Sequence, residues 1–333
     1  MTKPSTWSYG RLVLGCGMFG GIGGSPQLVG RGMDERAAFE TMDEAVELGI
    51  SLFDTAEAYA GGASEIMIGR WLAERASEAT GRVLLATKVA PGYFSGDIDA
   101  RLDAAFLETR FSNSLRRLDV DSVELLYTHA PDDATPIEVT LEGLEAIRAR
   151  GRCRQLGACN VDVIPLTTAL DAAQRLGIQG YQVVQNRYSL LQPEQERAVR
   201  SVCTERDVPF TAYSPLAGGA LTGKYRRNGG LPPDSRLALR PDGTDELLTP
   251  AVHDAIDRLR DAADGRGTDC GALALAWLLH QSDVSAPIIG PARLTPHLAL
   301  AAKALDVSLS DGEVTEIESW FASATAVGRP RGA

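Results

Sequence analysis

Residues 11–26 read RLVLGCGMFGGIGGSP, a short apolar run followed by glycines that satisfy the pattern G-x-G-x-x-G at residues 15–20. In an open, doubly wound α/β sheet this pattern is meaningful only when a helix opens directly behind it and an acidic residue follows about 20 positions later. Here glycines continue through residue 24, and a helix could begin among them only at a heavy entropic cost. The first plausible helix N-cap is Asp34, so the stretch argues against the open sheet.

The rest of the chain repeats one pattern of short β-rich runs separated by longer segments with apolar residues three and four positions apart. The runs cover residues 12–15, 50–54, 83–88, 123–127, 153–158, 181–185, 209–213 and 286–289. Eight strand–helix units without a linker predict a closed (β/α)8 TIM barrel that occupies residues 1–333 as a single domain. Two additions are expected, a Pro/Gly-rich loop at residues 229–243 and a terminal helix at residues 310–322.

Composition argues against several functional classes. A net charge of −11 without a block of Lys or Arg disfavours nucleic acid and anionic membranes as partners. The N-terminal segment lacks an apolar signal sequence, and no apolar run approaches the roughly 18 residues of a membrane span, so we expect a cytoplasmic protein. The oligomeric state stays open. Five scattered cysteines without a C-x-x-C pair indicate neither a disulfide framework nor a metal site: Cys16, Cys153, Cys159, Cys203 and Cys270.

Chemistry in a barrel of this kind is carried by the loops at the C-terminal ends of the strands, so the residues that end each run are the candidates. Each alone has a structural explanation such as capping or solvation, but several on one rim predict a functional site. These residues are Asp54, Lys88, His129, Asn160, Gln185, Tyr213 and Gly290.

Four ionisable residues can meet at one point of this rim, because they follow the second, third and fourth runs: Asp54, Tyr59, Lys88 and His129. A tyrosine is a poor proton donor at neutral pH, but a neighbouring ammonium favours the phenolate and lowers the tyrosine pKa. We expect Lys88 to supply that charge and Asp54 to balance it. His129 can then hold a substrate oxygen by a hydrogen bond.

Four stretches resemble the aldo-keto reductase family: FDTAEAYAGGASE (53–65), ATKVAPG (86–92), the segment at 114–160, and AYSPLAGGALTGKY (212–225). The last two look most like its aflatoxin-aldehyde reductase branch. The resemblance implies a TIM barrel that binds a nicotinamide cofactor across the rim and reduces carbonyl compounds. It also implies that Tyr59 is the general acid, that Lys88 and Asp54 tune it, and that His129 orients the carbonyl. The glycines at 15–20 then belong to the first strand and its loop.

The resemblance extends to cofactor contacts. Asn160 and Gln185 match residues that contact the carboxamide, beside Cys159 where the family often has serine. Tyr213 matches an aromatic that stacks on the nicotinamide. The positions that resemble pyrophosphate contacts are Ser214, Leu216 and Gly218.

The last segment departs from the family. The family commonly places a Glu and an Asn for adenine after Gly290, but neither residue type occurs from 290 to 305. Arg293 remains as a partner for the 2′-phosphate, with His297 as a weaker one, because a guanidinium fork matches phosphate oxygens. NADPH is therefore the favoured cofactor.

Three functions are considered for these residues, and His129 argues against the third. The first is reduction of an aldehyde or ketone to an alcohol, and the second is a cofactor-binding regulatory or sensor protein with little catalysis. The third, reduction of a conjugated double bond, usually goes with another residue in place of His129. Expected pocket walls are Phe19, Tyr93, Phe94 and parts of the 229–243 loop, which suit an apolar or ring-containing carbonyl compound.

Overall fold

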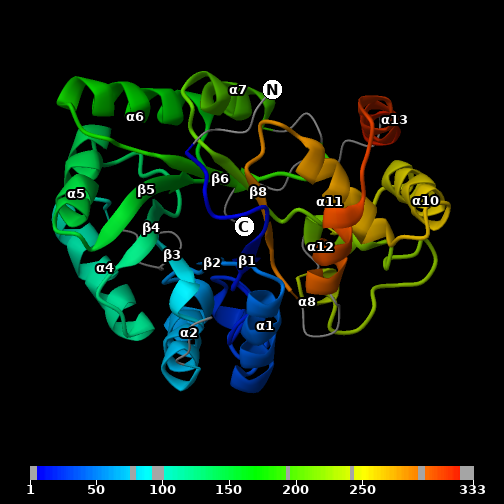
Figure 1. Ribbon diagram of the computed structural model, residues 1–333, viewed down its shortest axis with the longest axis horizontal. Helices are drawn as coiled ribbons and strands as arrows, with labels where there is room; N and C mark the ends of the chain where they lie inside the picture. Colours follow the sequence, from blue (N-terminus) through cyan, green and yellow to red (C-terminus); the bar gives the residue numbers. More distant parts are fainter. Residues whose placement is uncertain are drawn as a thin grey trace.

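In a computed structural model, which describes residues 6–75, 80–91, 101–192, 196–240, 244–291 and 297–322, the strands form one closed parallel barrel. Each strand pairs with the next along the chain, and the last pairs with the first (Figure 1). The strands are β1 (Val13–Gly15), β2 (Leu52–Asp54), β3 (Leu84–Val89), β4 (Val123–Thr128), β5 (Cys153–Cys159), β6 (Val183–Arg187), β7 (Phe210–Tyr213) and β8 (Ala286–Ile289). The predicted TIM barrel is confirmed.

Helices surround the strands on the outside of the barrel (Figure 1). Those that follow β1 to β6 are α1 (Glu35–Glu47), α2 (Ala63–Glu74), α4 (Ala104–Leu118), α5 (Ile137–Ala149), α6 (Val163–Leu176) and α7 (Arg197–Glu205). Those between β7 and the chain end are α8 (Arg236–Leu239), α9 (Thr244–Leu247), α10 (Pro250–Asp264), α11 (Cys270–His280), α12 (His297–Asp306) and the predicted terminal helix α13 (Asp311–Ala322). Short 3-10 turns are η1 (Pro26–Leu28), η2 (Tyr59–Gly62), η3 (Thr80–Arg82) and η4 (Ala217–Thr222). Among the described residues, no helix is long and apolar enough to span a membrane.

The glycine-rich stretch after β1 forms a loop, as its composition predicts. Only η1, three residues long, interrupts it before α1. The Asp34 carboxylate accepts a hydrogen bond from the Ala37 backbone N–H at 2.9 Å, so the predicted N-cap is confirmed. Gly32 packs so closely on this loop that a Cβ there would lie 2.0 Å from the Gly21 carbonyl oxygen. Position 32 therefore has no room for a side chain.

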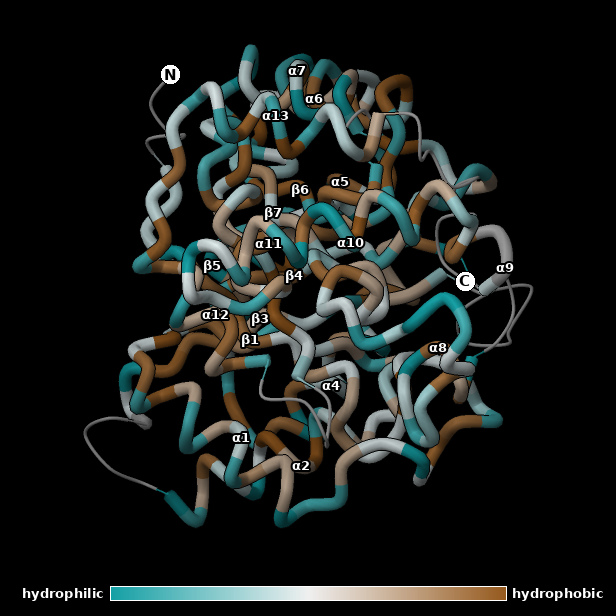
Figure 2. Tube along the Cα trace, turned by 90° about the vertical axis from the view of Figure 1, so that its right-hand side faces the viewer, coloured by the Kyte–Doolittle hydropathy of each residue, from teal (hydrophilic) through white to brown (hydrophobic). Residues whose placement is uncertain are grey.

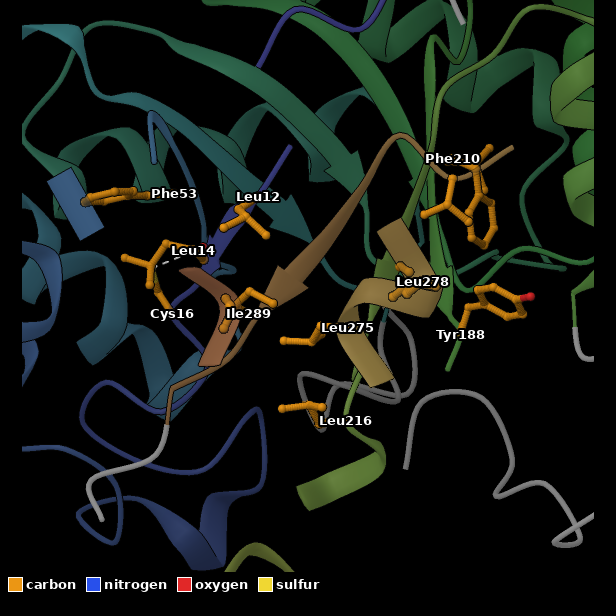
Figure 3. Close-up of a cluster of buried hydrophobic side chains, with 14 of the residues drawn as sticks. Leu12, Leu14, Cys16, Phe53, Tyr188, Phe210, Leu216, Leu275, Leu278 and Ile289 are labelled. Atoms are coloured by element: carbon orange, nitrogen blue, oxygen red, sulfur yellow. Dashed lines mark hydrogen bonds between the residues drawn. The ribbon is translucent and has the colours of Figure 1, made fainter. Parts of the chain in front are cut away.

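Alternation along the strands separates two apolar layers. Val13 points into the barrel with a small cluster that includes Leu52 and Tyr127. Leu12 and Leu14 belong to the larger layer between strands and helices. Figure 3 shows part of that layer, where Leu12 and Ile289 face Leu275 and Leu278 of α11. Hydrophobic residues concentrate on the central strands and hydrophilic ones on the outer turns (Figure 2).

One aromatic residue fills the barrel below its C-terminal end. Tyr127 on β4 is buried, and its ring centroid lies 5.9 Å from the Lys88 ammonium. Its neighbour on β5 is Gly157, where a Cβ would lie 2.3 Å from the Tyr127 ring. Glycine is therefore required at this position for the tyrosine to lie flat against β5 beneath Lys88.

Gly157→Ala should lower the free energy of unfolding by about 1–3 kcal/mol, because the added methyl group overpacks the barrel interior. Gly312→Ala is the matched control, since a Cβ there meets nothing within 4 Å and alanine favours helix α13. Urea denaturation of both variants measures the difference. Equal stability of the two variants would contradict the proposed close packing of Tyr127 on Gly157.

Candidate active site

A cavity of about 1280 Å³ opens at the C-terminal ends of the strands. It extends from the loop after β1 to α10 and α12, and it brings together most of the residues singled out in the sequence. Those that line it are Asp54, Tyr59, His129, Cys159, Asn160, Gln185, Tyr213, Ser214, Leu216, Gly218 and Gly290. Lys88 lies beneath them and is completely buried.

Lys88 and Asp54 form a buried ion pair at the floor of the cavity. The Lys88 ammonium donates to an Asp54 carboxylate oxygen, to the Thr55 carbonyl at 2.9 Å and to the Tyr59 hydroxyl at 3.4 Å. Burial alone would lower the pKa of Lys88, but the charge of Asp54 more than compensates and raises that pKa above its ordinary value. Lys88 is therefore a permanent cation next to the Tyr59 hydroxyl.

Tyr59 is held as a protonated phenol. Burial raises the pKa of Tyr59 to about 12, although the Lys88 ammonium acts in the opposite direction. The prediction that the tyrosine pKa falls is therefore wrong for the net shift, while the sign of the Lys88 contribution is as expected. Desolvation outweighs it because protein atoms surround the phenol at the floor of the cavity. Tyr59 thus keeps its proton throughout the neutral pH range.

His129 lies beside Tyr59 on the same rim. The two ring centroids are 5.6 Å apart, in an edge-to-face arrangement. The His129 backbone N–H donates to the Val89 carbonyl at 2.8 Å, which anchors the loop after β4 to β3. Burial and the Lys88 charge hold the pKa of His129 well below its ordinary value. The ring is therefore neutral and can donate at most one N–H to a substrate oxygen.

The amides Gln185 and Asn160 connect these groups. Gln185 donates to the second Asp54 carboxylate oxygen at 2.8 Å. Asn160 donates to the His129 carbonyl at 2.8 Å and accepts a hydrogen bond from the Tyr213 hydroxyl at 2.6 Å. The sequence assigns both amides to a cofactor carboxamide, and that assignment stays a prediction. In the structure they fix Asp54, His129 and Tyr213 relative to one another.

The segment after Tyr213 turns back on itself through residues with left-handed backbone conformation. Ser214 has φ of 53° and Gly218 has φ of 66°, and η4 follows the same irregular path. Gly219 leaves room for Lys224, whose ammonium would lie 2.7 Å from a Cβ there. Lys224 lines the cavity, and partial burial lowers its pKa. This segment therefore brings backbone groups and one cation to the cavity wall.

Some predicted site residues lie elsewhere. Phe19 was expected in the substrate pocket, but it is fully buried in the layer between strands and helices and does not line the cavity. It pairs with Met33 across the glycine loop, which turns its ring inward. Tyr93, Phe94 and Arg293 lie outside the described residues. His297 does reach the cavity, and its Nδ1 lies 3.0 Å from the Gly290 carbonyl oxygen.

The sequence contained signals for two residues that were not singled out. Arg187 lies two positions after Gln185 on the same strand, so alternation places both on one face. Lys224 directly follows the glycine-rich segment after Tyr213. Both line the cavity. A search of the described part of the chain finds no group of three His, Cys, Asp or Glu residues that could hold a metal ion.

Comparison with known proteins identifies relatives over most of the chain. The profile of the Aldo/keto reductase family matches residues 11–321. An uncharacterized oxidoreductase, YrpG of Bacillus subtilis, is 33% identical over 83% of this chain and 84% of its own. The aldo-keto reductase yakc [NADP(+)] of Schizosaccharomyces pombe is 30% identical over 88% and 85%. A probable voltage-gated potassium channel subunit beta of Arabidopsis thaliana is 32% identical over 79% and 80%.

A solved structure shares the fold. The glycerol dehydrogenase of Gluconobacter oxydans superposes with a TM-score of 0.77 at 24% identity. The superposition covers 100% of this chain and 98% of that chain. The two proteins therefore share the barrel fold.

Asp54→Asn should lower the free energy of unfolding by about 3–5 kcal/mol, because it leaves the Lys88 charge buried without its counter-ion. Lys88→Met should also be destabilising, and the double variant should lose less than the sum of the two single losses. Chemical denaturation of the four proteins measures this coupling. Single losses that add within about 0.5 kcal/mol would show that the two side chains do not stabilise each other.

Proposed function

This chain belongs to the aldo/keto reductase family and is an NAD(P)H-dependent oxidoreductase, and we propose that it reduces an aldehyde or ketone to an alcohol with NADPH. The observation that carries the proposal is the contact of the Tyr59 hydroxyl with a buried, permanently charged Lys88, 3.4 Å away. A nicotinamide cofactor, when bound, would supply the hydride, and Tyr59 would supply the proton to the carbonyl oxygen. We also propose that the chain belongs to the aflatoxin-aldehyde reductase branch of the family and that residues 1–333 form a single domain.

Each member of the site has a distinct part in this reaction. Tyr59 is a protonated donor at neutral pH, and the adjacent ammonium stabilises the phenolate that forms as the proton leaves. Asp54 keeps Lys88 charged inside the protein. The neutral His129 ring orients the carbonyl oxygen toward Tyr59. The result is a proton donor whose conjugate base is stabilised by a buried ammonium.

The cavity fits an extended anionic cofactor. Its volume of about 1280 Å³ exceeds the roughly 300–1,000 Å³ of typical small-molecule pockets. Although the whole protein carries a charge of −11, cations outnumber carboxylates along the cavity: the cations are Arg31, Arg187, Lys224, Arg226, Arg236, Arg240 and Arg260, and the carboxylates are Asp54, Asp234, Asp264 and Asp269. Lys224 has no carboxylate partner among the described residues. We assign Asn160, Gln185, Tyr213 and Cys159 to the nicotinamide end, and Ser214, Leu216, Gly218 and Lys224 to the pyrophosphate.

The proposed preference for NADPH rests on one arginine in the sequence and on the name of one relative. Arg293 lies in the segment that the family uses for the 2′-phosphate, and the yeast relative yakc is named for NADP(+). His297 fits this end less well as a phosphate partner, because burial lowers its pKa and leaves the ring neutral. Its Nδ1 donates to Gly290, so Nε2 is an acceptor that suits an adenine or ribose donor.

A second candidate function has one observation in its favour. Relatives from Arabidopsis thaliana and Oryza sativa are named probable potassium channel beta subunits. A regulatory role would need cofactor binding but not proton transfer. The complete set of Asp54, Tyr59, Lys88 and His129 favours the enzyme. Oxidation of NADPH with a generic aldehyde distinguishes the two functions, because a regulatory subunit without catalysis would not consume the cofactor.

Tyr59→Phe should reduce carbonyl turnover by about 10²- to 10⁴-fold, because the general acid is lost. The affinity for NADPH should stay nearly unchanged. Absorbance of NADPH under chemistry-limited conditions measures the rate. Tyr9→Phe is the control, since that hydroxyl bonds Glu124 and Gln155 away from the cavity. A Tyr59→Phe protein that keeps more than about a tenth of wild-type turnover would exclude Tyr59 as the proton donor.

Arg293→Ala should weaken NADPH binding roughly ten- to a hundredfold and leave NADH binding nearly unchanged, because only NADPH carries the 2′-phosphate. Fluorescence titration with both cofactors measures the dissociation constants. Arg154→Ala is the control. It removes the same charge from the start of strand β5, where the side chain is 76% exposed, and it should change neither dissociation constant. Equal losses for the two cofactors would mean that Arg293 does not recognise the phosphate.

A further inference from the structure

Arg187 is a cation on the cavity wall that the reaction described above does not use. It ends β6 and pairs in register with Tyr213 at the end of β7. Gln185, two residues earlier on the same face, contacts Asp54. Since a strand rises roughly 3.3 Å per residue, Arg187 starts about 7 Å above Gln185, toward the cavity opening. Its side chain lines the cavity one layer above the Asp54–Lys88 pair.

The Arg187 guanidinium has no carboxylate partner among the residues that the structure describes. Its carbon lies 5.6 Å from the centroid of the Tyr213 ring, and its Nε is buried without a hydrogen-bond partner. Two other part-buried arginines do have carboxylate partners: Arg117 lies 2.6 Å from Glu65, and Arg200, whose Nε is likewise buried without a partner in the described part of the chain, lies 2.6 Å from Asp283. A buried donor without a partner is costly. The Arg187 guanidinium thus interacts with the Tyr213 side chain, while its Nε has no acceptor among the described residues and is available to an external one.

The surroundings fix where that acceptor would lie. Tyr213 lies under the guanidinium and donates its hydroxyl hydrogen to Asn160, which in turn holds the His129 carbonyl. This series of contacts leads from Arg187 to the two rings, Tyr59 and His129, that we propose to receive the carbonyl oxygen. A ligand with an anionic group at one end and a carbonyl at the other would contact both places.

We propose that Arg187 determines substrate specificity by binding an anionic group, a carboxylate or a phosphate, on the carbonyl compound that the enzyme reduces. This inference rests on the proposed carbonyl reduction and names the substrate class for the same site. An anionic substrate replaces the apolar one expected from the sequence. That expectation depended partly on Phe19 as a pocket wall, but Phe19 is buried in the core. A guanidinium binds both oxoanions in bidentate fashion, so the charge of the substrate, rather than its ring, decides recognition.

Two matched substrates test the proposal in the wild-type enzyme. The enzyme should reduce 4-formylbenzoate with kcat/KM at least about tenfold above that for its neutral methyl ester, as expected for one charge-assisted hydrogen-bonded contact. 4-Formylphenyl phosphate, compared with 4-acetoxybenzaldehyde, distinguishes phosphate from carboxylate as the preferred group. The pair with the larger ratio identifies the anion. Ratios near one for both pairs would overturn the proposal while reduction itself stands.

Substitutions then assign the preference to Arg187. Arg187→Gln should remove most of the preference by raising KM for the anionic substrate about ten- to a hundredfold, with the ester nearly unaffected. Arg187→Lys keeps the charge but not the fork and should give an intermediate loss. Arg154→Gln, the same charge change at the opposite end of a strand, should have no effect.

Other outcomes separate the possible failures. If Arg187→Gln raises the dissociation constant for NADPH and keeps the substrate ratio, Arg187 contacts the cofactor and the proposal is wrong. If both Arg187 variants are folded, as judged by circular dichroism, and yet lower kcat/KM equally for the anionic substrate and its neutral ester, Arg187 is a positioning residue that does not determine substrate specificity. If wild-type protein reduces none of the four aldehydes although it binds NADPH, the proposed carbonyl reduction itself fails.

Discussion

The buried ion pair between Lys88 and Asp54 is the constraint on which the site depends. An ammonium can stay charged inside a protein only when an anion and further acceptors replace its water. Asp54 supplies one carboxylate oxygen, the Thr55 carbonyl adds a second acceptor, and Gln185 occupies the other Asp54 oxygen. Three strands, β2, β3 and β6, must therefore end at the same height. The position and the chemistry of Tyr59 follow from that arrangement.

The residues above this pair form a second, hydrogen-bonded layer. Asn160 joins the loop after β4 to Tyr213 on β7, so the groups proposed to hold the carbonyl and the nicotinamide are fixed by one amide. Arg187 stands beside Tyr213 in this layer. A charged floor, a bridging amide and the Arg187 guanidinium would recognise a carbonyl compound at two points. Catalysis and specificity would thus come from successive layers of one barrel rim.

The sequence predicts the barrel, the Asp34 cap and the approach of Asp54, Tyr59, Lys88 and His129 because these depend on local periodicity and on strand order. It fails for Phe19, whose direction is set by packing of the glycine loop on Met33, a contact between distant backbone segments. The pKa of Tyr59 also cannot be predicted from the sequence, because the desolvation of the phenol depends on how the folded cavity surrounds it. Arg187 could have been predicted as a cavity residue, since alternation along the strand places it on the same face as Gln185.

The most direct measurement is the pair of isotope effects on a single turnover of wild-type enzyme, followed by NADPH absorbance with a saturating aldehyde. If Tyr59 donates its proton as the hydride moves, both deuterated cofactor and heavy water slow the same step, and the two effects persist together. A rate that responds to deuterated cofactor but not to heavy water would contradict this, because the proton would then arrive after hydride transfer. In that case the Lys88–Tyr59 contact would not serve proton donation in the transition state.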